Sequence, residues 1–124
     1  VAMIHKHGGK AVGLTGKEHF GPANAYPFER LGNKGADPNP GDLQAVSAFL
    51  RRDAAQPFFL VVTSHQPHVP WNTGDPAAYP PEKQTVPPYL PDTPETRAFL
   101  SRYRAEVTYF DSQVGELVGL LDRS

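Results

Sequence analysis

Two short apolar runs in the first half of the chain predict β-strands. Residues 11–15 are mostly apolar and follow a glycine pair. Residues 58–63 form an unbroken apolar and β-prone run after Pro57. An unbroken run is typical of a strand that is covered on both faces, so we expect residues 58–63 to lie centrally in a parallel sheet.

Apolar residues at helical intervals predict a first helix between these two strands. We expect this helix to be capped by Asp42 and to end near Ala54. Its apolar positions are Leu43, Val46, Phe49 and Leu50. Strand, helix and strand in this order predict a βαβ unit, and therefore an α/β fold with a mostly parallel sheet and flanking helices.

A second and much longer helix is predicted at the C-terminal end. It begins either with Thr93 as the cap before Pro94 or with Asp92 and Glu95 as a capping box. Its apolar stripe consists of Phe99, Tyr103, Val107, Phe110, Val114, Leu117, Val118 and Leu121. A helix of about 28 residues is about 42 Å long, which is more than the rest of this chain can cover.

The remaining segments are predicted to be loops. Residues 23–41 are rich in proline and glycine, and we interpret them as one long connection. Residues 64–94 hold nine of the 14 prolines. Because proline lacks a backbone donor, this stretch is not expected to pair as a sheet, and a loop of that length usually serves a site.

The two ends suggest that residues 1–124 are the middle portion of a single larger domain, incomplete at both ends. The chain opens at Val1 on a segment that reads like the end of a helix closed by Gly8 and Gly9. It stops inside the apolar pattern of the last predicted helix. We therefore expect the missing segments of the same domain to be partners of this chain.

Composition narrows the class of protein. The 12 basic and 13 acidic residues give a formal net charge of −1, which offers no extended field for nucleic acid or an anionic membrane. No apolar run is long enough to cross a membrane. With no cysteine, the chain contains no disulfide, thiolate metal site or cysteine nucleophile.

Polar residues follow each predicted strand and form the candidate chemistry. Lys17 and His19 come after the first strand, and His65 and His68 come after the second. The carboxyl ends of neighbouring parallel strands meet at one edge of a sheet, so these side chains are expected to converge. An ammonium group and several imidazoles suit a sulfate or phosphate group and proton transfer to it.

Each of these residues also has an ordinary structural interpretation. A lysine between two glycines is common in surface turns, and the two later histidines could be one packed and one exposed side chain at a strand exit. The sequence gives only weak support to a zinc site, because the five histidines occur without cysteine and without a His-Glu-x-x-His helix.

Three motifs in the expected order resemble the sulfatase family. Residues 16–19 read Gly-Lys-Glu-His and resemble its Gly-Lys-x-His motif. Residues 57–68 resemble its second signature, an apolar strand ending in His-x-Pro-His, and residues 86–115 are similar to the segment where sulfatases enter a long helix. The Tyr-Pro-Phe of residues 26–28 is similar to the heparan N-sulfatase (sulfamidase) branch.

This resemblance implies an alkaline-phosphatase-like α/β sandwich and two groups that this chain lacks. Sulfatases use a formylglycine made from a Cys/Ser-x-Pro-x-Arg motif, and a calcium ion held by Asp and Asn side chains from the two ends of the domain. Neither motif nor ligand set is found in this sequence, so both are expected outside this chain. The resemblance also implies an exported location, whether periplasmic, secreted or lysosomal.

The resemblance further implies roles for the four polar residues. Lys17 matches the lysine that holds a sulfate oxygen, and His19 matches the histidine that acts as a general base. His65 matches the histidine that contacts the sulfate and protonates the leaving group. His68 would shape the loop or an outer substrate subsite, and Glu18 stands where many arylsulfatases have tryptophan.

The function expected from the sequence is therefore hydrolysis of sulfate esters or sulfamates. The implied substrate is a sulfated sugar, such as heparan-type glucosamine N-sulfate. Two alternatives remain open: a phosphodiesterase or phosphonate hydrolase of the same fold, and a non-catalytic carbohydrate-binding remnant. The isolated chain is expected to be inactive, because the nucleophile and metal lie elsewhere.

Overall fold

The computed structural model describes residues 11–19, 21–34, 40–53 and 55–124. The predicted helix end at residues 1–9 lies outside this part. The chain forms two compact units. One contains the residues up to His65 together with Leu117–Ser124, and the other is Gln66–Glu116.

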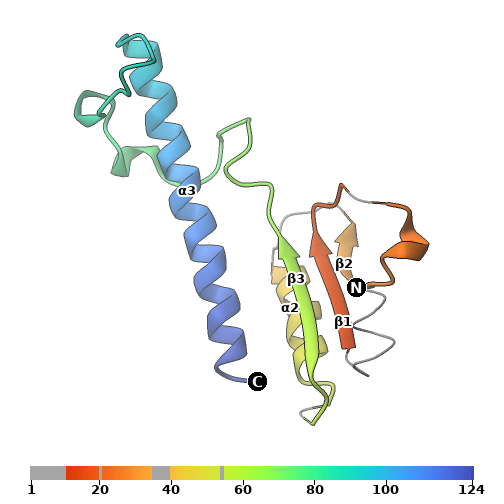
Figure 1. Cartoon of the computed structure of the whole chain (residues 1–124). Coiled ribbons are helices and arrows are strands. Elements are labelled where there is room, and N and C mark those ends of the chain that lie inside the picture. The colour runs from red at the N-terminus through yellow and green to blue at the C-terminus, as the bar shows by residue number, and fades with distance from the viewer. Residues whose placement is uncertain (1–10, 20, 35–39, 54) are drawn as a thin grey trace. The chain divides into compact units, whose positions relative to one another are not determined.

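The first unit is built on a parallel three-stranded sheet. Its strands are β1 (Ala11–Gly16), β2 (Glu29–Lys34) and β3 (Phe58–Thr63), in the order β2-β1-β3. β1 pairs with β3 without a break from Ala11 opposite Phe58 to Gly16 opposite Thr63. All three arrowheads in Figure 1 point to the same edge of the sheet. The predicted parallel pairing of the first and last strands is confirmed.

The strand β2 was not predicted, because its residues fall in the segment interpreted as one long loop. Its sequence is mostly polar, and its only buried side chain among those described is Leu31. β2 forms because the free edge of β1 supplies a parallel partner. Glu29 is the first residue of β2. Arg52, which follows the next helix, donates two hydrogen bonds of 2.6 Å to its carboxylate. The same bonds lower the pKa of Glu29.

The central position expected for residues 58–63 was wrong for the described sheet. β1 is the central strand, and its residues from Val12 onward are buried. β3 lies at the edge, and Phe58 and Phe59 are 42% and 38% exposed. An apolar run indicates that a strand is suited to burial. The place of that strand in the sheet depends on which other strands pair with it.

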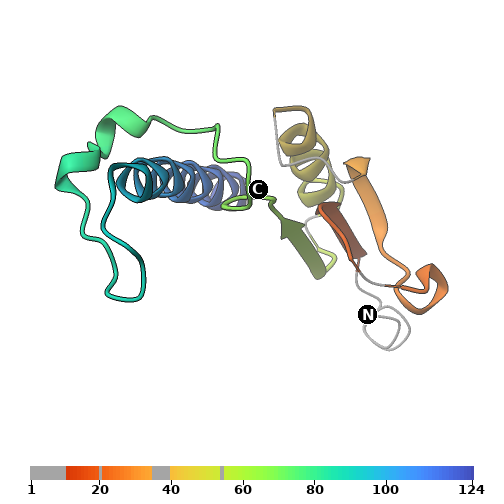
Figure 2. The same cartoon turned by 90° about the horizontal axis from the view of Figure 1, so that it is seen from above.

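The helix α2 (Pro40–Leu50) covers one face of this sheet, as Figure 2 shows. Its Val46, Phe49 and Leu50 form a buried cluster with Leu31 of β2. Leu60 and two leucines of the C-terminal segment, Leu117 and Leu120, pack against that cluster. This packing forms the hydrophobic core of the first unit.

Both predicted boundaries of α2 differ from the structure. The helix ends at Leu50 rather than near Ala54, which lies outside the described residues. It begins at Pro40, so Asp42 lies within the first turn instead of capping it. Asp42 is 1% exposed, and its carboxylate lies so close to Gly32 that a Cβ atom there would be 2.0 Å from Oδ1.

The second unit consists of a proline-rich loop and most of α3 (Pro94–Leu121). The loop contains two short 3₁₀ turns, η2 (Pro76–Ala78) and η3 (Pro81–Lys83). A further 3₁₀ turn, η1 (Ala23–Ala25), lies in the first unit. The predicted length of α3 and its first residue are confirmed, since the helix has 28 residues. No helix in the described ranges has the length and apolar character that a membrane crossing requires.

Thr93 rather than the Asp92 and Glu95 box begins α3. The Thr93 hydroxyl accepts a hydrogen bond from the backbone N–H of Thr96 at 3.2 Å. Asp92 instead accepts two hydrogen bonds from Arg97, at 2.5 and 2.6 Å, and these lower the pKa of Asp92. Arg97 also donates to the Gln84 carbonyl at 2.7 Å, which fastens the loop to the first turn of the helix.

Polar side chains occupy most of the buried positions of α3. The buried residues are Ser101, Ala105, Glu106 and Gln113. Members of the predicted apolar stripe are exposed, Phe99 by 52% and Val114 by 41%. The described residues leave much of this stripe uncovered, as its length led us to expect.

Replacing Gly16 by alanine is expected to destabilise the sheet edge. Gly16 has a φ of +87°, and a Cβ atom there would lie 1.8 Å from the Thr63 carbonyl oxygen. The positive φ alone costs about 1–3 kcal/mol of the free energy of unfolding, measured by urea denaturation. Gly115→Ala is the matched control, because its site is open and helical and should gain up to about 1 kcal/mol. Equal effects would contradict this account.

Candidate active-site edge

The candidate site lies at the carboxyl edge of the sheet. Gly16 and Thr63 form the last registered pair of β1 and β3. Lys17 follows β1 directly, and His65 is two residues beyond β3. Because the strands are adjacent and parallel, both residues leave the sheet at the same edge.

A hydroxyl group joins the ends of these two strands. The Thr63 hydroxyl lies 3.1 Å from the Thr15 carbonyl and also contacts the Lys17 carbonyl. The carbonyl oxygens accept from this one donor. The close approach is possible because Gly16 has no side chain and adopts a positive φ. The backbone on which Lys17 is mounted is therefore fixed to β3.

The variable position of the Gly-Lys-x-His segment is also fixed in place. Glu18 forms an ion pair with Arg30 of β2. The Glu18 side chain is only 12% exposed, so the pair is better shielded than a surface ion pair. The segment carrying Lys17 and His19 is thus held by both neighbouring strands, with Thr63 on one side and Arg30 on the other.

The four predicted site residues differ in exposure and in the unit to which they belong. Lys17 and His65 are half-buried, and His19 is exposed. These three belong to the first unit. Convergence of their functional atoms on one anion remains a prediction. His68 belongs to the second unit, where it is exposed and its Nδ1 lies 2.7 Å from the Val69 carbonyl.

The sequence analysis missed the residue that holds the loop after His68. Glu106 of α3 is 0% exposed, and its Oε1 accepts the backbone N–H groups of Asn72 and Thr73 at 2.7 and 3.2 Å. Such hydrogen bonds compensate for much of the cost of burying a carboxylate. The available signal was a glutamate at the helical spacing of the apolar stripe, seven residues after Phe99 and four before Phe110.

Trp71 connects the same loop to α3 by a second route. Its ring meets those of Phe99 and Tyr103 edge to face, with centroids 6.2 and 5.7 Å apart. Its Nε1 donates to the Pro67 carbonyl at 3.1 Å. Since Pro67 lies between His65 and His68, this bond fixes the middle of the His-x-Pro-His segment to the indole.

No group of three or more His, Asp or Glu side chains forms a metal site in the ranges that the structure describes. The side chains at the sheet edge, an ammonium group and imidazoles, are suited to an anion and not to a calcium ion, which takes oxygen ligands. The side chains described at this edge therefore do not form a calcium site.

Comparison with known proteins assigns the chain to a family. The profile of the sulfatase family matches residues 43–124, more than half of the chain. The chain belongs to the sulfatase family, and its parallel α/β architecture agrees with the alkaline-phosphatase-like fold of that family. The matched range includes His65 and His68, whereas Lys17 and His19 precede it.

The chain is also similar to a characterised human protein. It is 28% identical to N-sulphoglucosamine sulphohydrolase from Homo sapiens over 146 aligned positions. The alignment covers 91% of this chain and 28% of the human protein, so the chain spans about a quarter of the length of that relative. No solved structure matches the chain.

Replacing Thr63 by valine is expected to loosen the sheet edge. Valine keeps the shape but removes the donor to the Lys17 carbonyl, which should lower the free energy of unfolding by about 1–3 kcal/mol in urea denaturation. Thr63→Ser retains the hydroxyl and should lose less. A loss in Thr63→Ser as large as that in Thr63→Val, or larger, would contradict the assignment of the effect to the hydrogen bond.

Replacing Glu106 by leucine is expected to release the loop from α3. Leucine leaves the amides of Asn72 and Thr73 without their acceptor, so both should exchange hydrogen with solvent at least tenfold faster in an NMR exchange measurement. Glu106→Gln keeps an acceptor oxygen and should preserve most of the protection. Unchanged exchange in Glu106→Leu would contradict the proposed anchoring.

Proposed function

We propose that the whole protein containing this chain is a hydrolase of sulfate esters or sulfamates that acts on a sulfated sugar. The observation that carries the proposal is the parallel pairing of β1 and β3 in a chain of the sulfatase family, which puts Lys17 and His65 on one sheet edge. The name of the human relative supports glucosamine N-sulfate as the substrate class.

Within this proposal Lys17 and His65 recognise the sulfate group. The Lys17 ammonium holds a nonbridging sulfate oxygen, where negative charge must be stabilised in the transition state. His65 donates a hydrogen bond to the sulfate and delivers a proton to the departing sugar oxygen or nitrogen. Delivery of that proton avoids the release of a strongly basic anion.

His19 and His68 have separate proposed roles. His19 removes a proton on the side of the sulfate opposite the leaving group, acting as a general base. His68 shapes the loop or an outer part of the substrate site. It belongs to the loop that Trp71 and Glu106 fasten to α3.

The nucleophile and the calcium ion expected for a sulfatase are proposed to come from other segments of the whole protein. The sequence contains no cysteine and no serine in a Ser-x-Pro-x-Arg pattern, the precursor of formylglycine. The 124-residue chain alone is therefore proposed to be inactive, and an exported location is proposed from the family resemblance.

Lys17→Ala and His65→Ala are each expected to lower kcat/KM of the whole protein by about 10²-fold or more. The physical reason is the loss of charge stabilisation and proton delivery in the transition state. Steady-state hydrolysis of glucosamine N-sulfate and of an aryl sulfate measures the effect. His5→Ala is the control and should change kcat/KM little.

The pattern of losses separates the proposal from its alternatives. Equal losses in Lys17→Ala, His65→Ala and His5→Ala would indicate an effect on folding and would contradict the assigned roles. Higher kcat/KM for a phosphodiester than for any sulfated compound would overturn the sulfatase assignment.

A further inference from the structure

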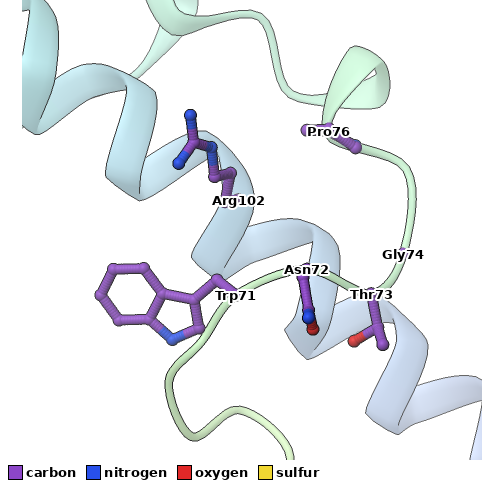
Figure 3. A pocket seen from close by; sticks show the side chains of 6 residues that line it. All are labelled: Trp71, Asn72, Thr73, Gly74, Pro76 and Arg102. Carbon is purple, nitrogen blue, oxygen red and sulfur yellow. The ribbon is translucent and has the colours of Figure 1, made fainter.

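The loop after His68 and the helix α3 line an open hollow of about 340 Å³ that the proposed roles do not use. Its lining residues are Trp71, Asn72, Thr73, Gly74, Pro76 and Arg102. In Figure 3 the loop runs across the helix, with the Trp71 indole and the Arg102 guanidinium on the same side of the crossing. A second hollow of about 530 Å³ shares Trp71, Asn72 and Arg102 with the first.

The walls of this hollow are fixed by contacts with α3. Glu106 holds the backbone of Asn72 and Thr73. The Ser101 hydroxyl donates to the Pro76 carbonyl at 3.1 Å. Gly74 has a φ of +74° and approaches so closely that a Cβ atom would be 2.3 Å from the Ala105 carbonyl oxygen. The shape of the hollow is therefore set before any ligand arrives.

Two polar side chains of this wall, Arg102 and Asn72, are available to bind a ligand. The Arg102 side chain is exposed and makes no ion pair or hydrogen bond with any residue in the described ranges. The Asn72 carboxamide likewise has no partner there. By contrast, the guanidinium groups of Arg52 and Arg97 are each engaged by a carboxylate. The hollow thus offers an aromatic surface, a neutral polar group and a guanidinium group that no ion pair engages in the described ranges.

These groups suit a sugar ring with an acidic substituent. A pyranose ring has an apolar face that can pack on the indole of Trp71, and its hydroxyls can pair with the Asn72 carboxamide. The planar guanidinium of Arg102 matches a carboxylate or a sulfate with two parallel hydrogen bonds. A volume of about 340 Å³ exceeds the need of an isolated inorganic anion and falls at the lower end of small-molecule sites.

The residues of the hollow follow the predicted catalytic segment closely in the sequence. Trp71 is three residues after His68 and six after His65. At about 3.5 Å per residue, the two separations are at most about 10 and 21 Å. A saccharide of two or more sugars can span distances of this order.

We infer that Trp71, Asn72 and Arg102 form an outer subsite for an acidic sugar unit, bearing a carboxylate or a sulfate, of the oligosaccharide whose terminal sulfate is removed. This inference rests on the proposed function and deepens it. It makes the protein a hydrolase that favours chains over single sugars, with Arg102 as a determinant of substrate specificity.

Arg102→Ala in the whole protein tests the subsite. Because Arg102 is exposed and makes no ion pair or hydrogen bond with the described residues, the variant should remain folded. KM for an acidic heparan-type tetrasaccharide should rise about tenfold with kcat unchanged, while both constants for monomeric glucosamine N-sulfate stay as in the wild type. Arg104→Ala, on the same helix and outside the lining of the hollow, is the matched control.

Arg102→Lys separates charge from geometry. Lysine retains the charge without the planar fork and should restore part of the lost affinity for the tetrasaccharide. The subsite is overturned if Arg102→Ala alters neither substrate, if it alters both equally, or if Arg104→Ala has the same effect.

A binding measurement keeps this test separate from the proposed function. If the wild-type protein hydrolyses no sulfated sugar, the proposed function fails, and calorimetric binding of the tetrasaccharide decides the subsite alone. About tenfold weaker binding by Arg102→Ala, with no such loss for a desulfated and carboxyl-reduced tetrasaccharide, supports the subsite. Equal affinities in the wild type and the variant overturn it.

Discussion

The parallel pairing of β1 and β3 is the constraint on which the candidate site depends. Six consecutive residues of each strand are in register, and the strands end together at Gly16 and Thr63. Two segments distant in the sequence are thereby joined, and the Thr63 hydroxyl contacts the carbonyl of Lys17, 46 residues earlier, at that point. Without this register, the lysine and the later histidine would have no reason to share a sheet edge.

A buried carboxylate plays the corresponding part in the second unit. Glu106 is fully enclosed and accepts two backbone N–H groups from the loop, an arrangement that satisfies donors that a proline-rich segment cannot pair in a sheet. Its Oε2 has no hydrogen-bond partner among the described residues. Glu106 therefore organises the loop together with the contacts of Trp71 on Phe99 and Tyr103, and much of the apolar stripe is left exposed within the described part of the chain.

The family match and one half of the candidate site, Lys17 and His19, lie in different parts of the chain. The matched sulfatase range begins at residue 43 and contains β3, the His-x-Pro-His segment and α3. Lys17 and His19 lie before it and are connected to it through the sheet and the Thr63 hydroxyl. The assignment of Lys17 to an anion site consequently depends on the tertiary structure more than that of His65 does.

The sequence by itself determined the strand at residues 58–63 and the helix that begins at Pro94, because an unbroken apolar run, a helical apolar period and a capping threonine are local properties of the chain. It also indicated Lys17, His19, His65 and His68 through motif spacing. Only the tertiary structure decided that polar residues 29–34 form a strand, that β1 is central, and that Glu106 is buried under the loop. Each of these three features depends on which distant segment of the chain supplies the hydrogen bonds. A partner that is distant in the sequence produces no periodic pattern in the residues that it binds.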